Sequence, residues 1–186
     1  MIFIKSESVS KVALRLALYQ PDIPQNTGTL LRLAACVGLA VDIIEPCGFL
    51  FDDRRLRRSG MDYVAGVDLA RHISWQAFLD ARRGHDTTGG GRLVLLTTIS
   101  TVPYTTFAFQ PGDTVLVGRE GSGVPEPVYS AADSRLCVPM LQGLRSLNVA
   151  VAASMVVGEA LRQLEVFPQG QSEPGEERLQ GERITP

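Results

Sequence analysis

Short apolar runs alternate along the chain with stretches in which apolar residues recur every three or four positions. The short runs are typical of strands buried in a parallel sheet, and they cover residues 14–19, 41–44, 93–98, 114–118 and 135–138. The stretches with helical spacing predict helices over residues 27–37, 74–83 and 147–166. Because strands and helices alternate, the pattern predicts an α/β fold whose mostly parallel sheet carries helices on both faces.

Small polar residues and glycines stand where these helices begin and end. Asn26 is placed to cap the first helix, Gly38 follows its last turn, and Ser74 is placed to cap the second helix. The third helix is apolar on most of its faces. This indicates burial against a partner subunit as well as against its own core.

The composition is that of one ordinary folded domain. Apolar residues make up 45% of the 186 positions and charged residues 20%. The apolar runs are shorter than the roughly 18 to 20 residues that a membrane span needs, and the amino terminus lacks the pattern of a secretory signal. We therefore expect a cytoplasmic protein without a membrane segment. Three widely spaced cysteines without a C-x-x-C pair predict neither disulfides nor a bound metal.

Charge and composition divide the chain into a domain and two flanking segments. Residues 13–167 form the expected domain, with an extension over 1–12 and a tail over 168–186 whose Glu, Gln, Gly and Pro content predicts disorder. The formal net charge is -2, and the tail carries four of the 20 acidic and two of the 18 basic residues, so the rest is neutral. A neutral domain does not coat nucleic acid indiscriminately, because such binding needs many lysines and arginines.

One short segment is nevertheless strongly basic. Residues 52–59 read as a helical turn that contains Arg54, Arg55, Arg57 and Arg58. Four guanidinium groups within five positions predict a phosphate-binding patch for RNA. A solvated helix face is the alternative interpretation of the same residues.

Polar and glycine-containing segments follow three of the predicted strands, where open α/β sheets bind their ligands. The first runs from Asn26 to Arg32 and begins a helix, whose free N–H groups suit an anionic or carbonyl-bearing ligand. The alternative is that Asn26 is only a cap and Arg32 only a solvated helix residue. The third segment contains Ser146 and Asn148, which serve either as helix caps or as ligands to a neighbour.

The second segment, residues 118–125, has three glycines around Glu120. It is neither a Walker A loop nor a G-x-G-x-x-G fingerprint. A carboxylate at this place repels phosphate and suits a cationic ligand or a hydroxyl donor. The alternative is a glycine-rich turn with an exposed glutamate.

Taken together, the three segments resemble the motifs of the SPOUT superfamily of RNA methyltransferases, in its branch of ribose 2'-O-methyltransferases. The strings at residues 19–28 (YQPDIPQNTG), 44–49 (IEPCGF) and 57–63 (RRSGMDY) are most similar to the compact tRNA (cytidine/uridine-34-2'-O)-methyltransferases. The resemblance runs from about Leu14 to Leu164. It implies transfer of a methyl group from S-adenosylmethionine to the ribose 2'-hydroxyl of the wobble nucleotide in the anticodon loop of tRNA.

The resemblance also implies a C-terminal trefoil knot, in which the loop over 139–147 and the following helix thread under the loop over 119–125. It implies a homodimer that binds the cofactor in the knot, near the subunit interface, and no metal. The residues expected to bind S-adenosylmethionine are Leu96, Thr97, Gly118, Glu120, Val138, Met140, Ser146 and Leu147.

The residues implied to be catalytic are Asn26, Arg32, Glu120, Ser146 and Asn148. Family schemes make Arg32 the group that activates the hydroxyl. A guanidinium stays protonated, however, so we expect Arg32 to bind the adjacent RNA phosphate and to stabilise developing oxyanion charge.

The chain departs from many relatives at two positions, with Ala150 in place of a serine and Gly158 in place of a tyrosine. Two other functions remain as alternatives. One is the same chemistry at another tRNA position or on ribosomal RNA. The other is a catalytically silent, RNA-binding dimer with this fold.

Overall fold

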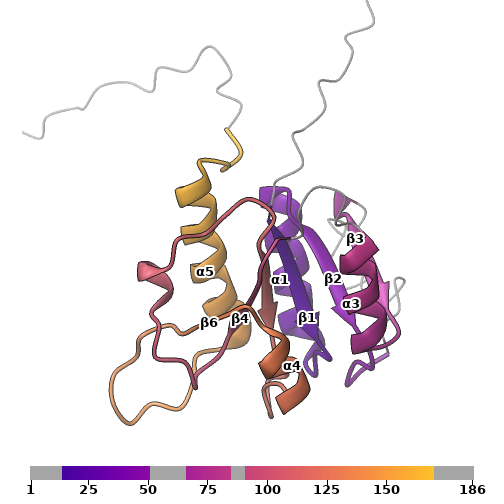
Figure 1. Ribbon diagram of the computed structural model, residues 1–186, viewed down its shortest axis with the longest axis horizontal. Helices are drawn as coiled ribbons and strands as arrows, with labels where there is room; N and C mark the ends of the chain where they lie inside the picture. The colour runs from indigo at the N-terminus through magenta and orange to yellow at the C-terminus, as the bar shows by residue number, and fades with distance from the viewer. Residues whose placement is uncertain (1–13, 51–65, 85–90, 170–186) are drawn as a thin grey trace, which may run out of the picture.

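The computed structural model describes residues 14–50, 66–84 and 91–169, and these residues form one sheet with helices on both faces (Figure 1). All strand pairs of the sheet are parallel, in the order β3-β2-β1-β5-β4-β6. The strands are β1 (Arg15–Tyr19), β2 (Ala40–Ile44), β3 (Leu69–His72), β4 (Leu93–Leu96), β5 (Thr114–Val117) and β6 (Ser134–Leu136). The predicted α/β class with a parallel sheet is confirmed.

Helices cover each face of the sheet in pairs. One face packs against α1 (Pro24–Val37) and α5 (Val149–Leu164), and the other packs against α3 (Trp75–Gly84) and α4 (Glu126–Ala131). A short 3-10 helix, η3 (Tyr104–Thr106), lies between β4 and β5 in the chain. The predicted placement of helices on both faces is therefore confirmed.

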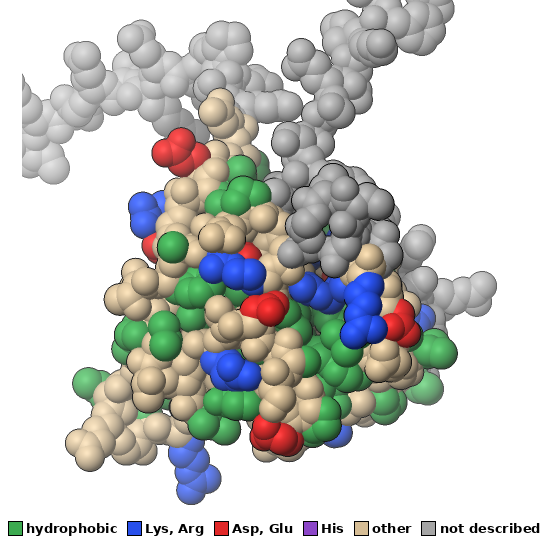
Figure 2. Space-filling model, in the orientation of Figure 1, with side chains coloured by type: hydrophobic (Ala, Val, Ile, Leu, Met, Phe, Trp, Pro, Cys, Tyr) green, Lys and Arg blue, Asp and Glu red, His purple; other side chains and the backbone are tan. Residues whose placement is uncertain are grey.

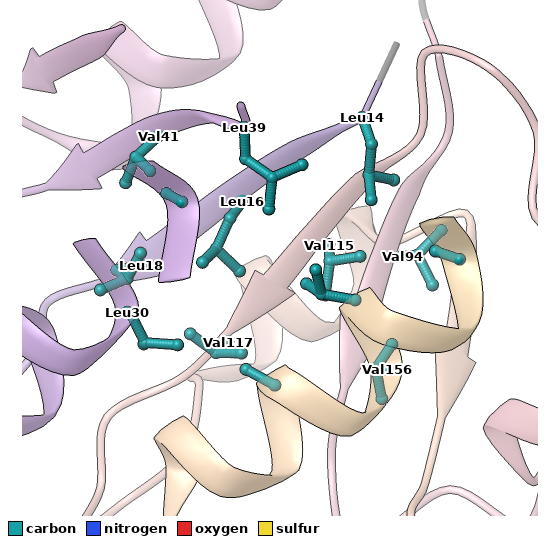
Figure 3. Packing of buried hydrophobic residues seen from close by; sticks show 14 of the residues in the cluster. Leu14, Leu16, Leu18, Leu30, Leu39, Val41, Val94, Val115, Val117 and Val156 are labelled. Carbon is teal, nitrogen blue, oxygen red and sulfur yellow. The ribbon is translucent and has the colours of Figure 1, made fainter. Parts of the chain in front are cut away.

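Alternate residues of each strand enter the two cores. Leu16 and Leu18 of β1 belong to the cluster shared with α1 and α5, whereas Ala17 and Tyr19 belong to the cluster shared with α3 and α4. Figure 3 shows the first cluster between the sheet and its helices, with Val156 of α5 among its members. Because both faces are buried, the inner strands β2, β1, β5 and β4 are apolar at most positions, as the sequence pattern predicted.

The order of the strands reverses between β1 and β5. The chain first builds β1, β2 and β3 outward in one direction, and β5, β4 and β6 then lie on the other side of β1. The connections that leave Tyr19 and Val117 diverge toward opposite faces, which opens a crevice beyond the carboxyl ends of these strands. Ligands of open α/β sheets bind in such a crevice.

The predicted start of α1 is wrong, because the helix begins at Pro24 and Asn26 lies within its first turn. Ile23 stands at the capping position and makes no side-chain cap bond. Proline is well suited to the first helical position, since its missing N–H would have no partner there. Gly38 ends this helix with φ 75°, as expected.

The caps predicted for the other two helices are confirmed. Ser74 Oγ accepts a hydrogen bond of 3.1 Å from the N–H of Ala77. Asn148 caps α5, although this helix starts two residues later than the pattern predicted. Three elements were not predicted at all, namely β3, η3 and α4.

Some predicted features lie outside the described residues. They are the arginines at 54, 55, 57 and 58, the whole extension over 1–12 and the tail over 170–186. Within the described ranges, no helix is long and apolar enough to cross a membrane.

Candidate active site

A cavity of about 570 Å³ lies beyond the carboxyl ends of β4 and β5. Its walls come from the residues that follow these two strands and from the loop between β6 and α5. Figure 1 shows this loop, in orange, extending from the edge at which the strands end. The cavity thus lies at the edge of the sheet where the predicted polar segments follow their strands.

Every residue predicted to bind the cofactor lines this cavity. These residues are Leu96, Thr97, Gly118, Glu120, Val138, Met140, Ser146 and Leu147. Asn26 and Asn148 line it as well. The structure thus brings together four of the five residues predicted to be catalytic.

Arg32 is the predicted catalytic residue that does not line the cavity. It is exposed on α1, six residues after Asn26, which places it roughly 9 Å farther along the helix axis. Arg32 is thus not among the residues that line the cavity with Asn26, Glu120 and Asn148.

A tight turn after β5 carries Glu120 at the cavity. Arg119 and Gly123 exchange two backbone hydrogen bonds of 2.9 and 3.0 Å, and Gly123 has φ 66°, which favours glycine. The turn folds back on Gly118, where an added Cβ would lie 2.7 Å from the carbonyl carbon of Gly123. Only glycine at position 118 allows the turn to lie this close to the end of the strand.

Asn148 connects the start of α5 to Asn26. Its Oδ1 accepts hydrogen bonds from the N–H groups of Ala150 (2.9 Å) and Val151 (3.3 Å). The amide nitrogen of Asn148 therefore faces away from the helix, and it donates to Oδ1 of Asn26 at 2.9 Å. The cap thus fixes the orientation of the Asn148 amide.

The series of hydrogen bonds ends on a carboxylate. With its Oδ1 occupied by Asn148, Asn26 donates through Nδ2 to Oε1 of Glu120 at 3.0 Å. The other oxygen, Oε2, accepts from the backbone N–H of Asp22 at 2.8 Å. Each donor and acceptor in the series is matched, which holds three polar side chains of the cavity in one arrangement.

Asp22 and Arg119 form an ion pair beside this series. Nη2 of Arg119 lies 2.7 Å from Oδ1 of Asp22, and Nε lies 3.2 Å from Oδ2. The hydrogen bond from Arg119, its positive charge and the backbone N–H of Gly121 hold the pKa of Asp22 below its ordinary value, against the opposing effect of burial. The Asp22 carboxylate is therefore fixed in its charged form.

Sequence reasoning missed this ion pair. Asp22 and Arg119 lie 97 positions apart, and neither belongs to a local pattern that assigns it a partner. The available signal was indirect, because each residue follows a predicted strand whose carboxyl end faces the same edge of the sheet.

Comparisons with known proteins identify the family of this chain. The profile of the SpoU rRNA Methylase family matches residues 13–158. A protein from Beijerinckia indica subsp. indica named tRNA (cytidine(34)-2'-O)-methyltransferase is 57% identical over 149 residues, which are 80% of this chain and 91% of that protein.

Solved structures show the same fold. A structure from work on the 2-OH methylation of C/U34 on tRNA has a TM-score of 0.74 and 40% identity, and the match covers 82% of this chain and 96% of that one. An AdoMet-bound rRNA methyltransferase from Sinorhizobium meliloti has a TM-score of 0.70 and 25% identity, with 81% and 56% covered. The resemblance expected from the sequence motifs is confirmed, and the chain belongs to the SpoU methylase family.

Proposed function

We propose that this protein transfers the methyl group of S-adenosylmethionine to the ribose 2'-hydroxyl of cytidine or uridine at position 34 of tRNA. One observation carries the proposal. The cavity that is lined by all predicted cofactor residues also contains the hydrogen-bonded series from Asn148 through Asn26 to Glu120. Relatives that match nearly the full domain and are named for this reaction support the same substrate.

The residues of the cavity fit the proposed cofactor. The cavity volume of about 570 Å³ falls in the range of roughly 300 to 1,000 Å³ that is usual for small-molecule sites. Val138, Met140 and Leu147 offer apolar surface for an adenine ring, while Thr97 and Gly118 offer backbone groups at the strand ends. When bound there, S-adenosylmethionine supplies an electrophilic methyl group carried by a positively charged sulfur.

Glu120 distinguishes this cavity from a phosphate site. Its carboxylate accepts from Asn26 and from the N–H of Asp22, and it repels anions. A negative group suits a ribose hydroxyl or a positively charged sulfur, and it disfavours a nucleotide phosphate. We infer that Asn26, Glu120 and Asn148 orient the sugar and the donor for direct displacement, in which correct alignment supplies a large part of the rate.

The position of Arg32 fits a role toward RNA outside the cavity. Its guanidinium remains charged and its side chain is exposed on α1. We infer that Arg32 binds the phosphate next to the target nucleotide and stabilises the charge that develops as the hydroxyl loses its proton. The proton then leaves to a phosphate oxygen or to water.

We propose the basic cluster at residues 54–58 as the surface that receives the anticodon loop. Figure 2 shows basic and acidic side chains interspersed among the described residues of the visible face, so this face offers no large patch of one sign. The four arginines of the cluster lie outside the described residues. Their density in the sequence remains the reason for the assignment.

Exposed apolar residues on α5 support the proposed homodimer. Val151 and Met155 are four residues apart on α5 and are 51% and 40% exposed, and Leu147, which lies two residues before the helix, is 39% exposed. Residues at this spacing share one face of a helix. Leu147 also lines the cavity, so an interface along this face would reach the cofactor site.

The proposed knot involves the same region. The turn after β5 and the loop before α5 both border the cavity. We propose that the loop over 139–147 passes under the turn over 119–125, as the family resemblance implies.

Incubation of unmodified tRNA with labelled S-adenosylmethionine tests the function, followed by mapping of the methylated ribose. We expect label on the 2'-oxygen of nucleotide 34. Label at another tRNA position or on ribosomal RNA would replace the proposed substrate. Cofactor binding by calorimetry without transfer to any RNA would favour the silent RNA-binding dimer instead.

A further inference from the structure

Asp22 contacts two consecutive residues of the turn after β5. Its backbone N–H donates to Glu120, and its carboxylate accepts from the side chain of Arg119. Asp22 therefore holds the turn directly at Arg119 and at Glu120.

A third loop supports Asp22 from the opposite side. The N–H of Gly48, which follows β2, donates to the carbonyl of Pro21 at 2.9 Å. An added Cβ at Gly48 would lie 2.9 Å from both Cα and Oδ1 of Asp22. The loops after β1, β2 and β5 thus meet at this one aspartate.

The geometry of Asp22 indicates an indirect role. Asp22 does not line the cavity, whereas Glu120 does. The side chains of Arg119 and Asp22 are 41% and 25% exposed, and ion pairs this exposed contribute little to folding. Small displacements of a reacting group, in contrast, lower rates strongly.

We propose that Asp22 is a positioning residue for methyl transfer, which holds the Glu120 carboxylate in place for Asn26 through its own backbone N–H and through its ion pair with Arg119. This inference rests on the proposed function. Asp22 takes no proton and touches no substrate. Its loss lets the turn, and Glu120 with it, move away from Asn26.

The primary test uses Asp22→Ala and Arg119→Ala, with cofactor affinity from calorimetry and kcat and KM from tRNA methylation. Each variant should lower kcat by about tenfold, because a displaced carboxylate misaligns the reacting groups. In Asp22→Ala, the Kd for S-adenosylmethionine and the KM for tRNA should stay within about threefold of wild type, because Asp22, unlike Arg119, does not line the cavity. An unchanged kcat in both variants would overturn the proposal.

Two further variants separate positioning from a general loss of structure. Arg119→Lys keeps the charge and should restore part of the lost kcat. The double variant Asp22→Ala with Arg119→Ala should be no slower than either single variant, because both remove one unit of structure. If the losses of kcat in the two single variants multiplied in the double variant, this would contradict the proposed clamp, by which we mean the Asp22–Arg119 pair that holds the turn.

Gly48→Ala tests the clamp without removing a functional group. The added methyl pushes against Asp22 and should lower kcat as Asp22→Ala does, with cofactor affinity retained. Gly66→Ala is the matched control, since a Cβ there would meet nothing within 4 Å. A Gly48→Ala variant as active as the control would count against the proposal.

Hydrogen exchange of the turn gives a readout that needs no activity. In Asp22→Ala, the N–H groups of Arg119 and Gly123 should exchange faster than in wild type, because their turn loses its anchor. If the wild type methylates no tRNA, the proposed function fails while this measurement still tests the clamp. Unchanged exchange would overturn the clamp even in an active enzyme.

Discussion

Two arginine–aspartate pairs at opposite ends of the sheet have nearly the same bonds and different surroundings. Before β4 and β5, Arg92 donates to Asp113 at 3.0 and 2.7 Å, and the side chain of Asp113 is fully buried. After β1 and β5, Arg119 donates to Asp22 at 3.2 and 2.7 Å, with both side chains partly exposed. The carboxylate of the first pair is therefore buried, although Arg92 is 29% exposed, whereas both members of the second pair are in contact with water.

The difference shows that burial decides what an ion pair does for a protein. Asp113 also accepts from the N–H of Gln110 at 2.8 Å, so its removal would take a buried acceptor away from both Arg92 and Gln110. Water can replace the partners of Asp22. We therefore assign Arg92–Asp113 to the stability of the domain and Arg119–Asp22 to the position of Glu120.

The largest expected effect is on stability at the buried pair. Asp113→Ala should lower the free energy of unfolding by about 3 kcal/mol, because it leaves Arg92 and the Gln110 N–H uncompensated. Urea denaturation of wild type and variant measures this change. A loss as small as that of Asp22→Ala would show that burial does not separate the two pairs.

The next effect divides the two tasks of Asn148. Asp at this position still accepts from the helix N–H groups but cannot donate to Asn26, so Asn148→Asp should keep stability within about 0.5 kcal/mol of wild type. Its kcat should fall by about tenfold or more, because the series that orients Glu120 is broken. Asn148→Ala should in addition lose about 1 kcal/mol of stability. Urea denaturation and methylation assays separate these outcomes. A fully active Asn148→Asp variant would show that the hydrogen bond from Asn148 to Asn26 is not needed for the reaction.

A smaller effect is expected at the exposed pair. Asp22→Ala should change the free energy of unfolding by less than about 1 kcal/mol, since exposed ion pairs are screened by water. The same denaturation assay measures it. A change that approaches the one at Asp113 would mean that the clamp is structural, and its effect on kcat would then need no positioning role.

The smallest effect is the pH dependence of that pair. The pKa of Asp22 lies below its ordinary value of 3.8 in the folded protein. Its contribution to stability is therefore complete above 3.8 and is lost as pH falls through the lowered pKa of the folded state. The stability difference between wild type and Asp22→Asn should be constant near neutral pH and shrink in acid. If this stability difference grew in acid, the pKa of Asp22 would be raised, and not lowered, in the folded protein.

The sequence pattern predicted the central strands because burial on both faces makes them apolar at almost every position. It missed β3, whose residues are only partly buried at the edge of the sheet and include Arg71 and His72. It also missed α4, a six-residue helix that begins within a proline-rich segment. Short and half-exposed elements depend on neighbours that are distant in the sequence.

The sequence predicted those residues of the site that follow strand ends or belong to family motifs. Parallel strands place their carboxyl ends at one edge, which is why residues near 26, 120 and 148 meet there. The start of α1 was misplaced because Pro24, rather than an Asn26 cap, begins the helix. The Asp22–Arg119 pair and the outward position of Arg32 depend on the packing of whole elements, which no local spacing encodes.

The fixed orientation of the Asn148 amide has a consequence for inhibitor chemistry. Because the first turn of α5 holds that amide, Asn148 donates to Asn26 and Asn26 donates to Glu120, and this direction cannot reverse without loss of the helix cap. A small molecule that reaches this end of the cavity therefore meets an acceptor. Hydroxyl or ammonium substituents should be tolerated there, and acids of the same shape should be rejected.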